Sequence, residues 1–192
     1  MADYNGTDED DIIDASELDS DIGNIYPGKG NDTVTNATSN HTIITGPGED
    51  NISGEKFGYA LWNATQAVTI NLKENWSEDG FGTRDTISGV ETIHGSSFGD
   101  TMYGSENYEK YFVNGGNNTI DGGGGNDRAS YAPGRGPSTN FEITYIDGSA
   151  HVKGENTLDI LKNVSTIEFM DDAKIFSVDN ENSNIRLGET FY

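Results

Sequence analysis

PGKGNDTVT, NATSNHTII and TGPGEDNIS are three consecutive nonapeptides that together fill residues 27–53. Each has a β-branched residue at its eighth position, so Val34, Ile43 and Ile52 recur at a spacing of nine. A fixed internal period is typical of repeat proteins, in which each unit buries its apolar side chains against the next unit. This stretch therefore predicts a repeat fold.

The same spacing extends to both sides of this stretch. Ile25 lies one step upstream, and Ile13 is reached after an insertion of three residues. A second register runs through GSSFGDTMY, GSENYEKYF, VNGGNNTID and GGGGNDRAS, which fill residues 95–130. The eighth positions of these four units are Met102, Tyr111, Ile120 and Ala129, and Ile93 lies nine residues before the first of them.

The nonapeptides favour turns and short strands over helices. A helical period of 3.6 is not sustained in them, and each offers six turn-forming positions before a short strand such as residues 33–35. Two nonapeptides per coil, with one strand on each side, would place residues 18 apart in the same column. Neighbouring strands in such a column are about 4.8 Å apart. We therefore expect an all-β fold in which parallel strands form a flattened roll.

The chain is expected to divide into two repeat blocks, residues 1–53 and 80–132, joined by a bridging segment at 54–79. The bridging segment contains a predicted strand over residues 67–72. Residues 138–192 predict an antiparallel β cap, because an uncapped stack of repeats exposes an apolar end and free strand edges.

Local signals support this division. The nine-residue repeat stops after residue 53, and a Pro- and Gly-rich linker occupies residues 133–137. After the linker, FEITYIDGSAHVKG predicts a β-hairpin around Asp147-Gly148. Alternating apolar residues in the next segment predict two further strands.

Composition indicates what kind of partner the fold needs. The 192 residues include 33 acidic and 11 basic side chains, for a formal net charge of -22, and only 32% are hydrophobic. So acidic a surface repels nucleic acids and anionic membranes, and no run of 18 apolar residues is present to span a bilayer. Cysteine is absent, so neither a disulfide nor a thiolate site can stabilise the fold. Multivalent cations held by oxygen ligands are the expected partner.

Four segments resemble the haemolysin-type repeat GGxGxDxUx, the calcium-binding pattern of RTX (repeats-in-toxin) proteins. They are NGTDEDD at 5–11, PGKGND at 27–32, TGPGED at 45–50 and GGGGND at 122–127. Residues 81–104 resemble the segment that these proteins place between repeat blocks. The resemblance implies a right-handed β-roll that binds several Ca²⁺ ions and is secreted by a bacterium through a type I apparatus. The final GETFY is similar to a type I tail signal.

The residue types in these segments suit calcium. Glycines at the first, second and fourth positions allow backbone conformations that turn carbonyl groups inward, and the sixth-position carboxylate supplies charge. Calcium takes six to eight oxygen ligands at about 2.3–2.6 Å, so carboxylates on strands about 4.8 Å apart can share an ion. A single Gly-Asn-Asp cluster would indicate only a turn. Several copies in register, each followed by an apolar residue, favour calcium binding.

The 18-residue spacing predicts which carboxylates lie together. Asp32 and Asp50 should share a column, which Asp11 joins if the three-residue insertion is absorbed in a loop. The opposite column of this block has Gly23 and His41 at its sixth positions and is expected to bind little or nothing.

The second block predicts weaker pairs. Glu109 pairs with Asp127, and Asp100 pairs with Asn118, while Asp85 is a candidate for an additional site. The candidate metal ligands are Asp11, Gly28, Gly30, Asp32, Gly46, Gly48, Asp50, Asp85, Asp100, Glu109, Gly122, Gly124 and Asp127.

These features predict a secreted, extracellular calcium-binding module that folds on binding Ca²⁺ and supports the secretion and stability of a larger protein. An enzyme is not expected, because the three histidines are far apart and neither HExxH nor GxSxG occurs. The alternative is a module that binds a polysaccharide or a cell surface through Phe57, Tyr59, Trp62 and Trp76, although core packing is the favoured interpretation of these aromatic residues. An ice-binding face would need a repeated Thr-x-Thr array, which is absent.

Overall fold

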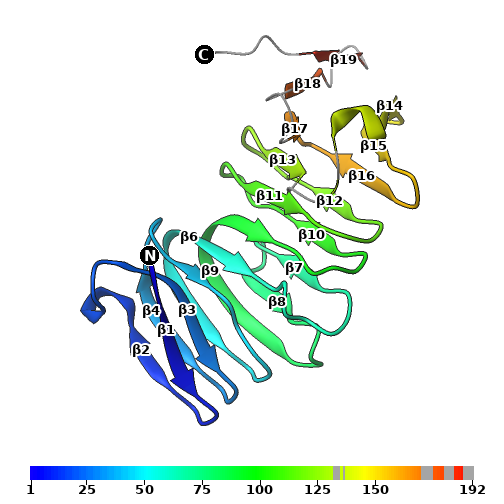
Figure 1. Cartoon of the computed structure of the whole chain (residues 1–192). Coiled ribbons are helices and arrows are strands. Elements are labelled where there is room, and N and C mark those ends of the chain that lie inside the picture. Colours follow the sequence, from blue (N-terminus) through cyan, green and yellow to red (C-terminus); the bar gives the residue numbers. More distant parts are fainter. Residues whose placement is uncertain (132–134, 136, 170–174, 180–183, 188–192) are drawn as a thin grey trace.

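The computed structural model shows short strands that coil around a thin core (Figure 1). It describes residues 1–131, 135, 137–169, 175–179 and 184–187. Within these residues the only helices are two short 3-10 turns, η1 (Ala15–Glu17) and η2 (Ser138–Asn140), and none could cross a membrane. The predicted all-β class and the parallel β-roll are confirmed.

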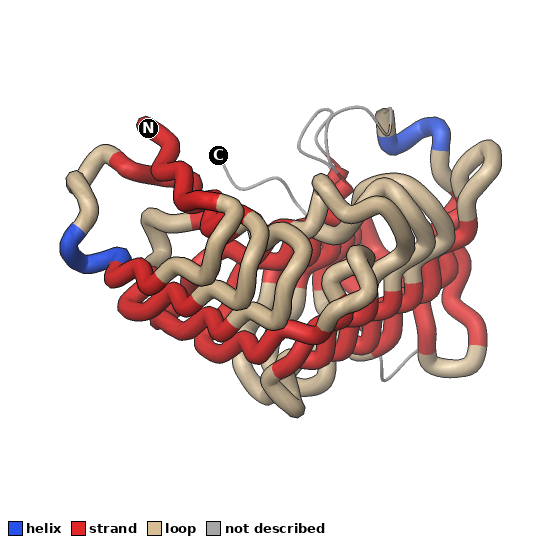
Figure 2. Tube along the Cα trace, turned by 90° about the horizontal axis from the view of Figure 1, so that it is seen from below, coloured by secondary structure: helices blue, strands red, loops and turns tan. Residues whose placement is uncertain are grey.

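The strands form one continuous sheet that folds into two faces, here called the first and the second sheet. Each coil contributes one strand to each face, and successive coils stack side by side (Figure 2). The first sheet contains β2 (Ile12–Asp14), β4 (Thr33–Ala37), the start of β6 (Asn51–Ala60), the start of β9 (Arg84–His94), β8 (Trp76–Glu78), β7 (Thr69–Asn71), β10 (Thr101–Tyr103), β12 (Thr119–Asp121) and β16 (Leu158–Lys162). The second sheet contains β1 (Ala2–Thr7), β3 (Ile22–Gly28), β5 (Thr42–Ile43), the ends of β6 and β9, β11 (Lys110–Val113), β13 (Arg128–Tyr131) and β17 (Thr166–Phe169).

The register of the parallel strands confirms two nonapeptides per coil. Val34 pairs with Ile52 in the first sheet, and Ile25 pairs with Ile43 in the second, each pair 18 residues apart. In the second block, residues 102 and 120 pair in the same way, as do residues 111 and 129. Ile13 pairs with Val34, because η1 and the turn after it take up the three-residue insertion.

The core is one row of side chains from each sheet. All ten predicted apolar positions are buried, from Ile13 at 3% exposure to Ala129 at 0%. Phe57 and Tyr59 are also fully buried and pack in this core, so they cannot form a sugar-binding surface. Because the core is only two side chains thick, its outermost side chains lie close to solvent and to the acidic turns that connect the two sheets.

The two repeat blocks share strands. The expected boundary at residue 53 falls inside β6, whose first half pairs with β4 and whose second half pairs with β5. β9 follows β6 along its whole length and then pairs with β11 of the second block. The predicted strand at 67–72 is the shorter β7, which forms an antiparallel hairpin with β8 between β9 and β10 of the first sheet.

The C-terminal region contains both antiparallel and parallel pairs. The predicted hairpin is formed by β14 (Glu142–Ile146) and β15 (Ser149–Lys153), and its turn residues Asp147 and Gly148 both have positive φ. β15 and β16 pair antiparallel, as do β17, β18 (Ile175–Asp179) and β19 (Asn184–Leu187). However, β16 and β17 pair in parallel with β12 and β13, so they add another coil to the roll. The tail at 188–192 lies outside the described residues.

Candidate metal sites

The predicted acidic residues line the two edges of the roll, where the chain turns from one sheet into the other. The first edge consists of the turns that lead from the second sheet into the first. It carries Asp11, Asp32, Asp50, Asp100 and Asn118. Asp85, at the start of β9, and Asp159, at the start of β16, continue the same edge after the inserted hairpins. The second edge consists of the turns in the opposite direction, and it carries Glu109 and Asp127.

Hydrogen bonds link the carboxylates of the first edge into a column. The backbone N–H of Asp11 donates to Oδ1 of Asp32 at 2.8 Å, and the N–H of Asp32 donates to Oδ1 of Asp50 at 2.9 Å. The N–H of Asp50 in turn donates to Oδ1 of Asp85 at 3.1 Å. The structure thus brings the three predicted residues together and adds Asp85 at the end of the same column.

The column continues on the same edge beyond the β7–β8 hairpin. The N–H of Asp100 donates to the side-chain oxygen of Asn118 at 3.0 Å, which forms the predicted pair. The N–H of Asn118 donates to Oδ1 of Asp159 at 2.9 Å. Asp159 is fully buried and was not among the predicted residues.

The second edge has one acidic pair. The N–H of Glu109 donates to Oδ1 of Asp127 at 2.7 Å, as the spacing predicts. In the first block this edge carries His41, whose Nδ1 accepts the backbone N–H of Thr38 at 3.0 Å. Burial lowers the pKa of His41, so this imidazole acts as a neutral loop residue.

The predicted glycines allow close contact between coils. A Cβ on Gly46 would overlap the carbonyl oxygen of Gly28, and a Cβ on Gly48 would overlap that of Gly30. Backbone carbonyl groups of one coil therefore lie against the glycines of the next, in the loops that carry the acidic column.

The glycines of the second edge are equally crowded. A Cβ on Gly122 would lie 2.5 Å from Oδ2 of Asp127 and 2.6 Å from the carbonyl oxygen of Asn163. A Cβ on Gly124 would lie 2.6 Å from Oε2 of Glu106. Gly122 thus leaves room beside the Asp127 carboxylate, where side-chain and backbone oxygens come together.

Three of the acidic residues keep one oxygen without a partner. Asp32, Asp50 and Asp127 are at most 2% exposed, and no described donor reaches Oδ2 of any of them. Burial raises the pKa of Asp50 and of Asp127 to about 7, and nearby carboxylates add to the effect. A buried, unpaired carboxylate oxygen is costly unless a cation binds it.

Calcium fits this set of donors. No three His, Asp or Glu side chains converge within the described part of the chain, so an ion between coils would need backbone carbonyl ligands as well. Calcium accepts such mixed oxygen ligands, whereas Zn²⁺ favours nitrogen and sulfur. Asp32 and Asp50, with the carbonyl groups of Gly28 and Gly30, are the residues that would hold it in the first block.

Comparison with known families agrees with this chemistry. Residues 85–107 and 112–134 match the family model of the RTX calcium-binding nonapeptide repeat, in four copies. These segments are RTX calcium-binding repeats. They cover about a quarter of the chain. No curated protein matches the chain. The first block lies outside the matched RTX segments, but it has the same 18-residue coil and the same column of carboxylates.

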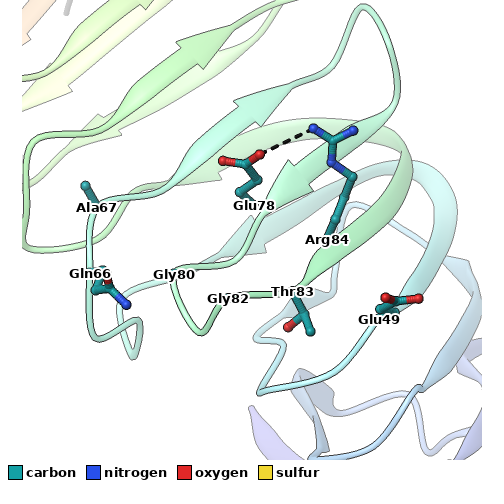
Figure 3. A pocket seen from close by; sticks show the side chains of 8 residues that line it. All are labelled: Glu49, Gln66, Ala67, Glu78, Gly80, Gly82, Thr83 and Arg84. Carbon is teal, nitrogen blue, oxygen red and sulfur yellow. Dashed lines mark hydrogen bonds and ion pairs between the residues drawn. The ribbon is translucent and has the colours of Figure 1, made fainter.

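A cavity of about 410 Å³ lies beside the Asp50 loop, between that loop and the β8–β9 turn (Figure 3). Glu49, Glu78 and Arg84 line it, and Arg84 forms an exposed ion pair with Glu78 at 3.3 Å. Thr83 links the cavity wall to the turn, since its hydroxyl donates to Oδ2 of Asp79 at 2.6 Å. None of the predicted metal ligands lines this cavity.

Several residues of the site were not predicted. Tyr59 donates its hydroxyl to Oδ2 of Asp85 at 2.5 Å, and Arg135 forms a 2.7 Å ion pair with Oδ2 of Asp159. A signal for Asp159 exists, because Asp159-Ile160-Leu161 repeats the acid-x-apolar pattern of residues 32–34. No spacing in the sequence indicates Tyr59 or Arg135 as partners.

Proposed function

We propose that this chain is a folding module that requires calcium, in which ions held between adjacent coils convert an expanded acidic chain into the roll. The observation that carries the proposal is the set of buried Oδ2 atoms of Asp32, Asp50 and Asp127, which have no donor among the described residues. The charges of these carboxylates oppose the fold when no cation is present. Calcium supplies the positive charge and accepts these oxygens as ligands.

The proposed setting is extracellular. Where calcium is scarce, as in a cytosol, the acidic chain would stay expanded and ready for export. Outside the cell, where calcium is millimolar, even weak sites would fill and the module would fold. In this setting the module supports the secretion and stability of a larger bacterial protein that leaves through a type I apparatus, and it is not itself an enzyme. The RTX repeats at 85–134 support this setting.

Circular dichroism during a calcium titration tests the proposal. We expect a change from coil to β-structure with calcium but not with magnesium, which demands a smaller octahedral site and keeps its waters. The double variant Asp32→Ala/Asp50→Ala should need more calcium, whereas Asp3→Ala/Asp8→Ala, which removes two exposed carboxylates, should behave like the wild type. A spectrum that is already rich in β-structure in EGTA and does not change with calcium would contradict the proposal.

A surface that binds carbohydrate is a second candidate, favoured by one observation. Trp62 is 44% exposed, and its ring meets His94 edge-on at 5.3 Å, while His94 stacks on Phe112 at 4.2 Å. Trp62, the exposed end of this row, can stack on a sugar ring. In contrast, His94 and Phe112 are half-buried, and the Lys110 ammonium lies 4.6 Å over the Phe112 ring. Trp76 is a weaker candidate, because the guanidinium of Arg84 covers its ring at 3.9 Å.

A glycan array in calcium buffer tests this second candidate. Hits that disappear with Trp62→Ala would support it. This variant leaves the buried core residue Tyr59 unchanged. A blank array would count against it.

A further inference from the structure

The acidic columns contain two kinds of loop, which differ in how the carboxylate is satisfied. In the first kind, Oδ2 of Asp32, Asp50 or Asp127 is buried and no described donor reaches it. The residue four positions before each of these acids is a glycine. These glycines are Gly28, Gly46 and Gly123.

In the second kind of loop, a hydroxyl residue four positions before the acid bonds to the carboxylate. Thr7 donates to Oδ2 of Asp11 from both its N–H, at 2.7 Å, and its hydroxyl, at 2.9 Å. Ser96 donates its N–H to Oδ2 of Asp100 at 2.8 Å and its hydroxyl to Oδ1 at 2.5 Å. Each carboxylate therefore receives two donors from its own loop.

The Glu109 loop follows the same rule despite its longer acid. Ser105 donates its N–H to Oε2 of Glu109 at 3.2 Å and its hydroxyl to Oε1 at 2.5 Å. The identity of the residue four positions before the acid thus separates the two kinds of loop on both edges of the roll.

The carboxylates of the remaining two acids accept hydrogen bonds from residues distant in sequence. The phenol of Tyr59 donates to Oδ2 of Asp85 at 2.5 Å. Oδ2 of Asp159 accepts from the guanidinium of Arg135 at 2.7 Å and from the phenol of Tyr131 at 3.1 Å. A calcium ion at either acid would have to displace these donors from the same oxygen.

We infer that calcium binding is confined to the loops with glycine four residues before the acid, and that a Ser or Thr hydroxyl takes the place of the ion in the others. Donors and calcium compete for the same carboxylate oxygens, so a loop already closed by Thr or Ser gains little from an ion. This inference rests on the proposed function, since it assumes that the chain binds calcium. It divides the predicted ligands into Asp32, Asp50 and Asp127, which bind ions, and Asp11, Asp100 and Glu109, which do not.

The first experiment counts the ions bound by the whole chain at saturation, by equilibrium dialysis and isothermal titration calorimetry with calcium alone. Asp32→Asn, Asp50→Asn and Asp127→Asn keep the Oδ1 acceptor that holds the coils in register but lose the charged ligand. We expect each to lose bound calcium or to bind it roughly tenfold more weakly, because ligand charge sets calcium affinity. Asp100→Asn and Glu109→Gln should bind as many ions as the wild type.

The outcomes distinguish this inference from the proposed function. A wild-type chain that binds no calcium would overturn both. A wild-type chain that binds calcium, but loses as many ions with Asp100→Asn or Glu109→Gln as with Asp32→Asn, would overturn the inference and leave the proposed function standing.

The second experiment tests the hydroxyl directly and does not depend on removing an acid. Ser96→Ala deletes the donor to Asp100, whereas Ser97→Ala changes the exposed neighbour. We expect Ser96→Ala to raise the calcium concentration at the midpoint of the circular dichroism transition without changing the number of ions bound. The control should leave both quantities unchanged. Equal midpoints for the two variants would overturn the role assigned to the hydroxyl.

Discussion

Gly28 and Gly82 have similar backbone conformations but very different surroundings. Their φ angles are +120° and +106°, where an L-residue is strained by about 1–3 kcal/mol. A Cβ on Gly28 would overlap the carbonyl oxygen of Thr7 in the preceding coil, whereas a Cβ on Gly82 would meet nothing within 4 Å. We expect Gly28→Ala to lower the melting temperature in saturating calcium much more than Gly82→Ala. Equal losses of melting temperature would mean that the overlap between a new Cβ and the neighbouring coil costs nothing beyond the backbone strain.

The buried carboxylates make the stability of the calcium-free fold depend on pH. Burial raises the pKa of Asp50 and Asp127 to about 7 and that of Asp85 to about 6, above the usual value of an unfolded aspartate. Between about pH 4 and pH 7 the folded state therefore holds more protons than the unfolded state, so its stability falls as the pH rises. In EGTA we expect more β-structure at pH 5 than at pH 8. The opposite trend would show that these carboxylates are not buried without calcium.

The same linkage predicts competition between protons and calcium. Calcium binding requires the carboxylates of Asp50 and Asp127 to be ionised, so it should weaken as the pH falls. Near pH 5, where the calcium-free fold is favoured and these carboxyl groups hold protons, binding should release those protons. Calorimetric titrations in buffers with different ionisation enthalpies measure this release. Asp50→Asn should release fewer protons per ion than the wild type, and an unchanged release would assign the protons to other groups.

At the scale of elements, the sequence predicts the coils in which nonapeptides follow one another without interruption. The apolar rows and the Asp32–Asp50, Glu109–Asp127 and Asp100–Asn118 pairs follow from the 18-residue period alone. The period does not predict where coils become longer. Asp50 pairs with Asp85 across 35 residues and Asn118 with Asp159 across 41, because hairpins are inserted in these coils. Sequence spacing cannot show which acid resumes the column after an insertion of unknown length.

The closing coil of the roll depends on a buried ion pair. Arg135 is 12% exposed, and Asp159, its partner at 2.7 Å, is fully buried below Asn118 at the end of the first-edge column. Removing one partner of a buried pair costs about 3–5 kcal/mol, because the other charge is left uncompensated. Arg135→Ala should therefore lower the free energy of unfolding by about this amount, as measured by urea denaturation in calcium.

Arg84 provides the matched control for this prediction. Its ion pair with Glu78 is 57% exposed on both sides, and pairs of this kind contribute about 0–1 kcal/mol. Arg84→Ala should therefore have little effect on the same measurement. Similar losses for the two arginines would contradict a special role for Arg135 at the end of the roll.

At the scale of the whole molecule, charge opposes the fold. A net charge of -22 on 192 residues with a thin core favours an expanded chain unless cations neutralise the columns. Small-angle X-ray scattering should give a radius of gyration in EGTA nearer the roughly 47 Å of an unfolded chain of this length than the roughly 16 Å of a compact one. Calcium should reduce it sharply, although the elongated roll stays above the compact value.

Salt distinguishes general repulsion from specific binding. Raising sodium chloride toward about 1 M shortens the screening length from about 10 Å to about 3 Å, which weakens repulsion between exposed charges. The calcium-free chain should shrink only partly, because sodium does not supply the charge that the buried oxygens of Asp32 and Asp50 require. Collapse in salt alone to the dimensions seen in calcium would contradict the need for bound ions.

The 18-residue register also governs how quickly the roll can assemble. Parallel sheets normally form slowly, because their partner strands are far apart in sequence and the closing loops are long. Here most parallel partner strands are only 16–21 residues apart, so each new coil closes a short loop against one already in place. The roll can therefore grow coil by coil, without waiting for the far end of the chain. The slowest steps should be the coils that carry the inserted hairpins, where the gap reaches 41 residues and loop closure costs about 0.7 kcal/mol more.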